Sequence, residues 1–246
     1  KIDYITFTNV FAHINDFSNL IKNLKKLISI DTKIVIENHY LGSVINKFQF
    51  DSFYHEHPRT YSLTSFFYIS KLLGMNIEYF DFPKRYGGNI RVVMSKSKSN
   101  PKILKAIKKE NRYYELFNSN LNIFENWLKI KNEKILKLNK KYGHLKAKAF
   151  PARASLIIKF LNLDEKNIDF VYEKQKSKKI GYYVPGTKIK IKSDKFIKKD
   201  LKNYKGPIIN LAWHIDKEVR NYLTKMKINN KLINIIDIKE IKECEY

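Results

Sequence analysis

The stretch YITFTNVFAHINDFSNLIKNLKKLISIDTKIVIE, residues 4–37, decides the fold of the first part of the chain. Residues 4–10 form a short apolar run rich in β-formers, and residues 33–37 form a second run of the buried-strand type. Between them, residues 16–28 place apolar side chains at helical spacing. Strand, helix and strand in this order make a βαβ unit. The stretch therefore predicts an α/β fold with a parallel sheet that is covered on both faces.

Two more strands and a helix are predicted after this unit. Ser62 and the residues after it supply caps for a helix that runs through Leu73, where Gly74 stops it. Residues 76–82 and 89–95 are predicted strands on either side of a turn. We expect these two strands to form the closing hairpin of the sheet.

The second half of the chain is predicted to contain a connector and another domain. Residues 101–142 are a long helical stretch with a predicted break near residues 118–120, and too few apolar positions for a domain of its own. From Lys146 strands and helices alternate again, which predicts a second, small, doubly wound domain. Its strands are expected at residues 146–150, 169–172, 207–211 and 232–236, its helices at residues 154–161 and 217–226, and a solvated loop at residues 174–179. The predicted organisation is thus residues 1–98 for the first α/β domain, 99–143 for the connector and 144–246 for a Rossmann-like domain.

The composition of the chain indicates which kinds of molecule it is expected to bind. The formal net charge of +24 suggests nucleic acid, because Lys and Arg release counterions from phosphates. The lysines are spread along the whole chain, which is typical of a compositional bias and argues against a nucleic-acid site. The positive charge would still attract small anionic substrates. Cys244 is the only cysteine, so we expect no disulfide framework, no metal site in this chain and a reducing, cytoplasmic location. No apolar run reaches the roughly 18 to 20 residues that span a bilayer, so no membrane association is expected.

Several polar side chains follow the predicted strands of the first domain, where ligands of open α/β sheets bind. They are Asn9, His13, Glu37, Tyr40 and the tetrapeptide Tyr54-His55-Glu56-His57, and Asn89 joins them at the start of the last predicted strand. The tetrapeptide puts two imidazoles, a carboxylate and a phenol into one turn, and these groups suit acid–base chemistry near neutral pH. A satisfied polar turn is the alternative for the tetrapeptide, and a packed or capping histidine is the alternative for His13.

Eight ordered segments carry a resemblance to a known family. They are NVFAHI (9–14), IENHYLG (36–42), KFQFDSFYHEH (47–57), YSLTSF (61–66), GGNIRV (87–92), AFPARAS (149–155), GYYVPGTKI (181–189) and LAWHIDKEV (211–219). In this order, and over almost the whole chain, they resemble the sugar C-methyltransferase family. The resemblance implies the last strands of a class I methyltransferase Rossmann-like sheet, followed by a second small Rossmann-like α/β domain. It also implies transfer of a methyl group from S-adenosylmethionine to a carbon of a nucleotide-linked deoxy keto sugar.

Two upstream parts of that family have no counterpart in residues 1–246. They are a cysteine-rich zinc-binding segment and the glycine-rich first strand-loop-helix, which holds the amino-acid part of the cofactor. We therefore expect zinc only in such an upstream segment, and we expect this chain to be the later part of the enzyme. A noncatalytic module that binds nucleotide sugars remains the alternative.

The resemblance assigns roles to the polar residues of the first domain. The family reaction removes a proton beside a ketone and stabilises the resulting enolate. His57 is then the expected base, Glu56 its orienting partner, and Tyr54 the hydrogen-bond donor to the sugar oxygen. His13 is the alternative base, and His55 is less essential because the family has Asp or His there. Cofactor contacts are expected from Asn9 and Glu37, and substrate contacts from Tyr40 and Asn89.

Four residues of the second domain are candidates for substrate contact. Arg153, at the start of a predicted helix, suits a phosphate, or else only begins a surface helix. Tyr183 and Thr187 flank a Pro-Gly pair that could lie beside a nucleotide or simply form a tight turn. Trp213 could contact a base or close a domain interface.

Overall fold

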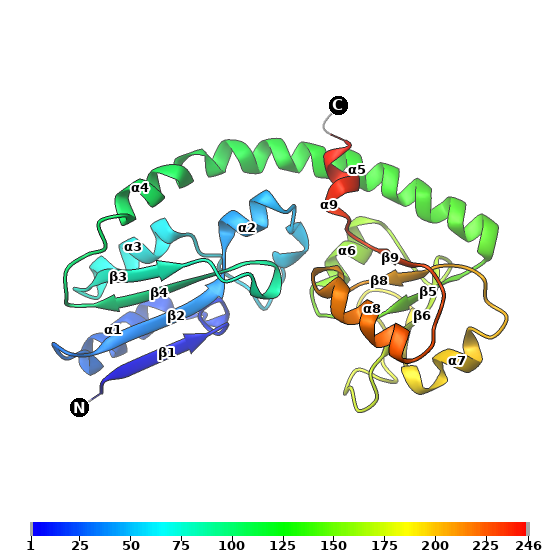
Figure 1. The fold of residues 1–246 in the computed structure, drawn as a ribbon, viewed down its shortest axis with the longest axis horizontal. Helices are drawn as coiled ribbons and strands as arrows, with labels where there is room; N and C mark the ends of the chain where they lie inside the picture. The colour runs from blue at the N-terminus through cyan, green and yellow to red at the C-terminus, as the bar shows by residue number, and fades with distance from the viewer. Residues whose placement is uncertain (1, 245–246) are drawn as a thin grey trace. The chain divides into compact units, whose positions relative to one another are not determined.

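The computed structural model describes residues 2–244, and the chain clusters into two compact units, Lys1–Asn120 and Leu121–Tyr246 (Figure 1). The division falls within α5 (Tyr113–Tyr142), so the stretch predicted as a connector contributes to both units. Each unit has a β-sheet with helices, which confirms the predicted α/β class. No helix in residues 2–244 combines the length and the apolarity needed to cross a bilayer.

The sheet of the first unit is mixed. It contains β1 (Tyr4–Thr8), β2 (Lys33–His39), β3 (Asn76–Asp81) and β4 (Asn89–Ser95) in the order β1-β2-β4-β3. β1 and β2 are parallel and α1 (Phe17–Leu27) joins them, which confirms the βαβ unit. β4 runs antiparallel to both β2 and β3, so the predicted hairpin is present and β4 lies between β2 and β3.

Helix boundaries in this unit follow from local capping. The Asp16 side chain accepts a hydrogen bond from the Asn19 N–H at the start of α1. Ser62 and Ser65 form a reciprocal capping box at the start of α3 (Leu63–Leu72), and Gly74 follows its end with φ +66°. Shorter turns lie at the sheet edge: α2 (Leu41–Asn46) and 3₁₀ turns at Phe11–His13, Phe50–Ser52 and Arg85–Gly87.

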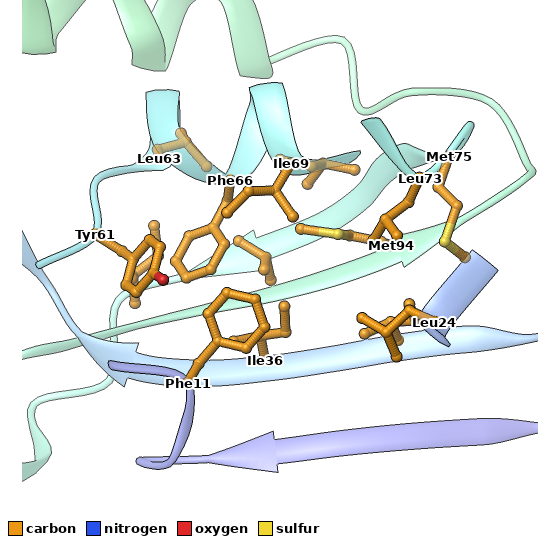
Figure 2. Close-up of a cluster of buried hydrophobic side chains, with 14 of the residues drawn as sticks. Phe11, Leu24, Ile36, Tyr61, Leu63, Phe66, Ile69, Leu73, Met75 and Met94 are labelled. Carbon is orange, nitrogen blue, oxygen red and sulfur yellow. The ribbon is translucent and has the colours of Figure 1, made fainter. Parts of the chain in front are cut away.

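The core of the first unit lies on one face of its sheet (Figure 2). The fully buried Phe11 ring contacts the rings of Tyr61 and Phe66, with centroids 5.2 and 6.0 Å apart, and α1 adds Leu24 to the same cluster. Residues of the opposite face, such as Val35 and Val93, stay partly exposed. The expectation that this sheet is covered on both faces is therefore wrong for the described chain, because α1 and α3 pack on the same face.

The α-helical stretch is interrupted at a different place from the one predicted. α4 (Ile103–Lys108) is followed by a 3₁₀ turn at Lys109–Arg112, whereas α5 runs without interruption through residues 118–120. Asparagine breaks helices by bonding to its own backbone, but Asn120 instead donates to the Ile45 carbonyl at 2.8 Å. The predicted break near residues 118–120 is thus wrong.

The second unit has a five-stranded, all-parallel sheet. Its strands are β5 (Leu145–Lys148), β6 (Ile168–Glu173), β7 (Lys190–Ser193), β8 (Ile208–Asn210) and β9 (Leu232–Asn234), in the order β7-β6-β5-β8-β9. Its helices are α6 (Ala154–Phe160), α7 (Ile197–Asp200), α8 (Asp216–Lys225) and α9 (Ile238–Lys242). The chain moves from β5 to β6 and β7 on one side, then to β8 and β9 on the other. The strand order therefore reverses between β5 and β8.

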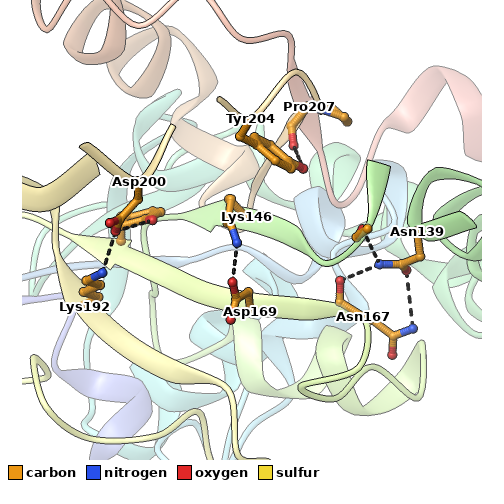
Figure 3. A network of polar contacts seen from close by, with 10 residues as sticks. Asn139, Lys146, Asn167, Asp169, Lys192, Asp200, Tyr204 and Pro207 are labelled. Atoms are coloured by element: carbon orange, nitrogen blue, oxygen red, sulfur yellow. Dashed lines mark hydrogen bonds and ion pairs between the residues drawn. The ribbon is translucent and has the colours of Figure 1, made fainter. Parts of the chain in front are cut away.

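Strand lysines of this unit are paired within the fold, as Figure 3 shows. Lys146 pairs with Asp169, and Lys192 lies 2.6 Å from Asp200, which also accepts a hydrogen bond from the Tyr172 hydroxyl. Part of the positive charge therefore neutralises internal carboxylates.

Candidate active site

One edge of the first sheet brings together three of the expected site residues. They are Asn9, Glu37 and Asn89, which were predicted to lie at strand ends. The Asn89 amide donates to Asn9 Oδ1 at 3.1 Å and to Glu37 Oε1 at 3.0 Å. Arg91 Nε and Nη2 donate to Glu37 Oε2 at 3.0 and 2.8 Å. We call these four residues the polar frame. Asn9 adopts a left-handed backbone with φ +53°, which asparagine tolerates, and its N–H donates to the Glu37 carbonyl.

Glu37 is buried and ionised within the polar frame. Burial alone would raise the pKa of its carboxyl, but hydrogen bonds from Asn89 and Arg91, with the charges of Arg91 and Arg85, lower the pKa overall. Both of its oxygens already accept hydrogen bonds. This arrangement favours Glu37 as an anchor that orients Asn9 and Asn89.

Two buried polar atoms beside the frame have no hydrogen-bond partner within residues 2–244. They are Asn38 Nδ2, a donor, and Asn89 Oδ1, an acceptor. The Asn38 side chain is fixed because its Oδ1 accepts from the Ala12 N–H at 3.3 Å. Asn38 pairs with the core residue Ile90, whereas Asn89 lies on the opposite face with Glu37, so only the Asn89 Oδ1 acceptor lies on the face of the polar frame.

A second cluster brings together two histidines from different connections. His13 lies on the 3₁₀ turn after β1, and His57 closes a turn in which its N–H donates to the Tyr54 carbonyl. Their ring centroids are 4.7 Å apart, and we call them the histidine pair. The Tyr54 hydroxyl lies 3.3 Å from His57 Nε2. The His13 ring contacts the backbone carbonyl of Glu56, which lies 43 residues further along the sequence. The tertiary fold therefore brings this cluster together.

The contact with Glu56 determines the tautomer of His13. His13 Nδ1 lies 2.6 Å from the Glu56 carbonyl oxygen, which can only accept, so Nδ1 carries the proton. In neutral His13 the lone pair is then on Nε2, where it can take up a proton. Glu56 thus contacts the histidine pair through its backbone carbonyl. His55 is neighbour to the Tyr54 ring, at a centroid distance of 5.9 Å.

His57 also lines a groove of about 470 Å³ in the first unit. The other lining residues are mostly apolar or aromatic: Leu41, Ile45, Phe53, Pro58, Thr60, Tyr113, Tyr114 and Phe117. A concave apolar surface with a few titratable groups at its wall is the usual form of a small-molecule site.

Two further residues, which were not among the expected site residues, support the edge. The buried Gln49 amide contacts His39 Nε2 at 3.0 Å and donates to the Gly87 carbonyl at 3.0 Å. Gly88 has φ +127°, and a Cβ there would lie 2.3 Å from Ser43 Oγ, so only glycine fits. Gln49 lies within the segment KFQFDSFYHEH, which was the one signal for it.

The Tyr40 hydroxyl forms hydrogen bonds with two other side chains of the first unit. It donates to Glu110 at 2.8 Å and lies 2.6 Å from the Tyr113 hydroxyl. Burial, together with these two neighbours, raises the pKa of Tyr40. In this arrangement the hydroxyl is occupied by protein groups.

The four candidates for substrate contact in the second unit lie in two groups, Arg153 with Trp213 and Tyr183 with Thr187. Arg153 is buried, and its guanidinium lies over the Trp213 ring at 5.5 Å from the centroid, so the alternative of a surface helix start is wrong. The Thr187 N–H and hydroxyl both bond to the Val184 carbonyl, and Gly186 has φ +78°. The structure therefore has the tight turn that was the alternative reading, with Tyr183 exposed at its start.

Residues 2–244 contain no group of three or more His, Cys, Asp or Glu side chains arranged to hold a metal ion.

Comparison with known proteins gives one family. The profile of the C-methyltransferase C-terminal domain matches residues 84–236, which is more than half of the chain. The match includes Asn89, Arg91 and the candidates of the second unit, and it begins after the histidine pair. A search of curated proteins finds no significant match.

Proposed function

Because this chain belongs to the C-methyltransferase C-terminal domain family, we propose that it takes part in methylating a carbon of a nucleotide-linked keto sugar, with S-adenosylmethionine as methyl donor. The observation that carries the proposal is the histidine pair beside Tyr54 and the apolar groove. C-methylation beside a ketone needs a base and a hydrogen-bond donor close together, and this cluster supplies both.

His57 is the proposed base. Its imidazole removes the proton from the carbon beside the ketone, and the electrons of that C–H bond move onto the ketone oxygen as the enolate forms. The Tyr54 hydroxyl donates a hydrogen bond to that oxygen and stabilises its negative charge. Its distance of 3.3 Å from His57 Nε2 supports joint action of the two groups on one substrate.

His13 and Glu56 have supporting roles in this proposal. The Glu56 carbonyl holds His13 with its Nε2 lone pair available, and the contact of the two rings keeps His13 beside the base. His13 therefore positions His57 and offers a second proton acceptor.

The polar frame fits one wall of a site for S-adenosylmethionine. Asn89 Oδ1, which has no partner within residues 2–244, offers an acceptor on this face, and Asn9 and Glu37 orient the Asn89 side chain. When bound, this cofactor supplies an electrophilic methyl group. Substrate contacts from Tyr40, Arg153, Tyr183, Thr187 and Trp213 belong to the same proposal; the buried guanidinium of Arg153 is the best suited of these to an anionic group.

The test separates proton removal from methyl transfer. Full-length protein is incubated in D₂O with a panel of nucleotide-linked keto sugars, and loss of the C–H signal beside the ketone is followed by NMR. His57→Asn should slow this exchange by about 10²–10⁴-fold. His55→Asn is the matched control, because it changes the neighbouring histidine of the same turn, and it should keep the exchange rate.

Addition of labelled S-adenosylmethionine then identifies the methylated atom. A methyl group on carbon, lost in His57→Asn, supports the proposal. A methyl group on oxygen, or near-normal exchange in His57→Asn together with loss in His13→Asn, contradicts the assigned reaction or the assigned base.

A further inference from the structure

The first unit contains a second groove, between α4 and the end of β3, that the histidine pair does not line. Its volume is about 630 Å³, which is within the range of sites for small molecules. Its walls come from the end of β2 with α2, the end of β3, the helical stretch of α4, and the start of α5. We call it the α4 groove. It shares Tyr113 with the groove beside His57 but is otherwise lined by different residues.

Aromatic rings form part of the wall of the α4 groove. The Phe82 ring centroid lies 4.8 Å from that of Tyr40 and 6.0 Å from that of Phe80. The interplanar angles of 46° and 77° belong to tilted and edge-to-face pairs, in which aromatic rings attract one another. Although these rings pack together, 46% of Phe82 is exposed. The wall therefore has room for a further aromatic ring.

The hydroxyl groups of this aromatic wall are occupied by protein groups. The hydroxyls of Tyr40 and Tyr113 lie 2.6 Å apart, and Tyr40 also donates to Glu110. Asn46 supplies the remaining uncharged polar side chain among the lining residues. A ligand with many hydroxyls would lose its hydrogen bonds to water here and find few replacements. The α4 groove therefore disfavours a sugar.

Three lysines give the α4 groove its charge. Lys102, Lys105 and Lys109 are spaced by three and four residues, which places them on one face of the helical stretch, and the small Ala106 lines the groove with them. Among residues 2–244 none of the three lysines has an ion pair or a side-chain hydrogen bond. No Asp or Glu lines the groove. An anion is therefore the complementary ligand.

We propose that the α4 groove binds a small planar aromatic carboxylate, with its ring against Phe80 and Phe82 and its carboxylate facing the lysines. The rings select a flat apolar ligand, and the ammonium groups act as point charges for the anion. The inference does not rest on methyl transfer, because neither His13 nor His57 lines this groove.

Calorimetry on the 246-residue chain tests the chemistry of the ligand. The probes are 2-naphthoate, its neutral amide 2-naphthamide, and the saturated acid decahydro-2-naphthoate. 2-Naphthoate should bind with a Kd of about 1 mM or tighter, and each of the other two should bind about tenfold more weakly. Added NaCl should weaken 2-naphthoate and leave 2-naphthamide unchanged, because salt screens exposed charges.

Matched variants locate the probe. Lys105→Gln should weaken 2-naphthoate about threefold, whereas Lys108→Gln, an exposed lysine of the same helix outside the groove, should keep the parent Kd. Phe82→Leu should weaken 2-naphthoate about fivefold. Phe53→Leu is its control, because Phe53 is a partly exposed ring that lines the groove beside His57, and it should keep the parent Kd.

Five results would overturn the proposal. Three concern the ligand and the charge: no binding of 2-naphthoate, equally tight binding of the neutral amide or the saturated acid, or equal affinities in Lys105→Gln and Lys108→Gln. The fourth is weaker binding in Phe53→Leu with none in Phe82→Leu, since the probe would then occupy the groove beside His57. The fifth is displacement of 2-naphthoate by a nucleoside 5′-monophosphate, since the groove would then belong to a nucleotide site.

Discussion

Replacing Glu110 should destabilise the first unit far more than its place in a helical connector would suggest. Its carboxylate accepts hydrogen bonds from the N–H groups of Leu63 and Thr64 at 2.9 and 2.8 Å, and also from the Thr64 and Tyr40 hydroxyls. Glu110 therefore caps the start of α3 from another part of the chain. Only 8% of the residue is exposed, so water screens these contacts little.

The magnitude follows from the groups left without an acceptor in Glu110→Ala. Losing the cap of α3 costs about 1–2 kcal/mol, and each of the two hydroxyl contacts adds about 1 kcal/mol. We expect a loss of about 3 kcal/mol in unfolding free energy, and about half of that for Glu110→Gln, which keeps one acceptor oxygen. Glu115→Ala is the control, because its side chain is 74% exposed and it should change stability by less than about 0.5 kcal/mol.

Urea unfolding followed by circular dichroism measures the global effect. Hydrogen exchange of the peptide that spans α3 measures the local effect on this helix, since the Leu63 and Thr64 N–H groups should exchange faster in Glu110→Ala. If Glu110→Ala and Glu115→Ala had equal stability, and α3 exchanged as in the parent protein, the capping argument would be refuted.

Three further changes test the core and the sheet edge. Phe11→Ala removes the fully buried ring at the centre of the first core and should cost about 3–5 kcal/mol in urea unfolding, whereas a cost below about 1 kcal/mol would mean that the ring is not packed as described. Gly42→Ala puts a Cβ 2.2 Å from the Tyr113 hydroxyl, so we expect a loss of about 1–3 kcal/mol in thermal unfolding; an unchanged Tm would contradict this close approach. The pKa of Glu37 is lowered in the folded state, so its ionised form stabilises fully above its unfolded pKa of 4.5, and this stabilisation is lost as pH falls through the folded pKa. The difference in unfolding free energy between the parent and Glu37→Gln should therefore narrow as pH falls below 4.5, and a difference that widens on acidification would reject the ion pair with Arg91.

Local sequence was sufficient for most strands and helices because their signals are local. The apolar run at residues 33–37 and the Ser62 cap act within a few neighbours, and both elements are present. β7 was not predicted because it is four residues long and alternates Lys with Ile and Ser, so its only apolar anchor is Ile191. Its strand pairing with β6 comes from the fold, which supplies the partner edge.

The site was predictable to the extent that topology brings strand ends together. Asn9 and Glu37 do meet near the carboxyl ends of β1 and β2, as the rule for strand ends implies, and Asn89 joins them because β4 runs antiparallel to β2 and begins there. The contacts of Tyr40 were not predictable, because Glu110 and Tyr113 lie 70 and 73 residues further along the chain. The same reason hid the role of Glu56, whose backbone carbonyl contacts His13.

In the first unit, the buried ion pair of the polar frame and the proposed proton acceptors of the histidine pair are different groups of residues. Glu37 is the buried carboxylate of the sheet edge, and its two oxygens accept hydrogen bonds from Asn89 and Arg91. His13 is oriented instead by a neutral carbonyl, which fixes its tautomer without adding negative charge. Substitutions in the polar frame should therefore act through stability and ligand affinity, whereas substitutions in the histidine pair should act on the rate of proton removal.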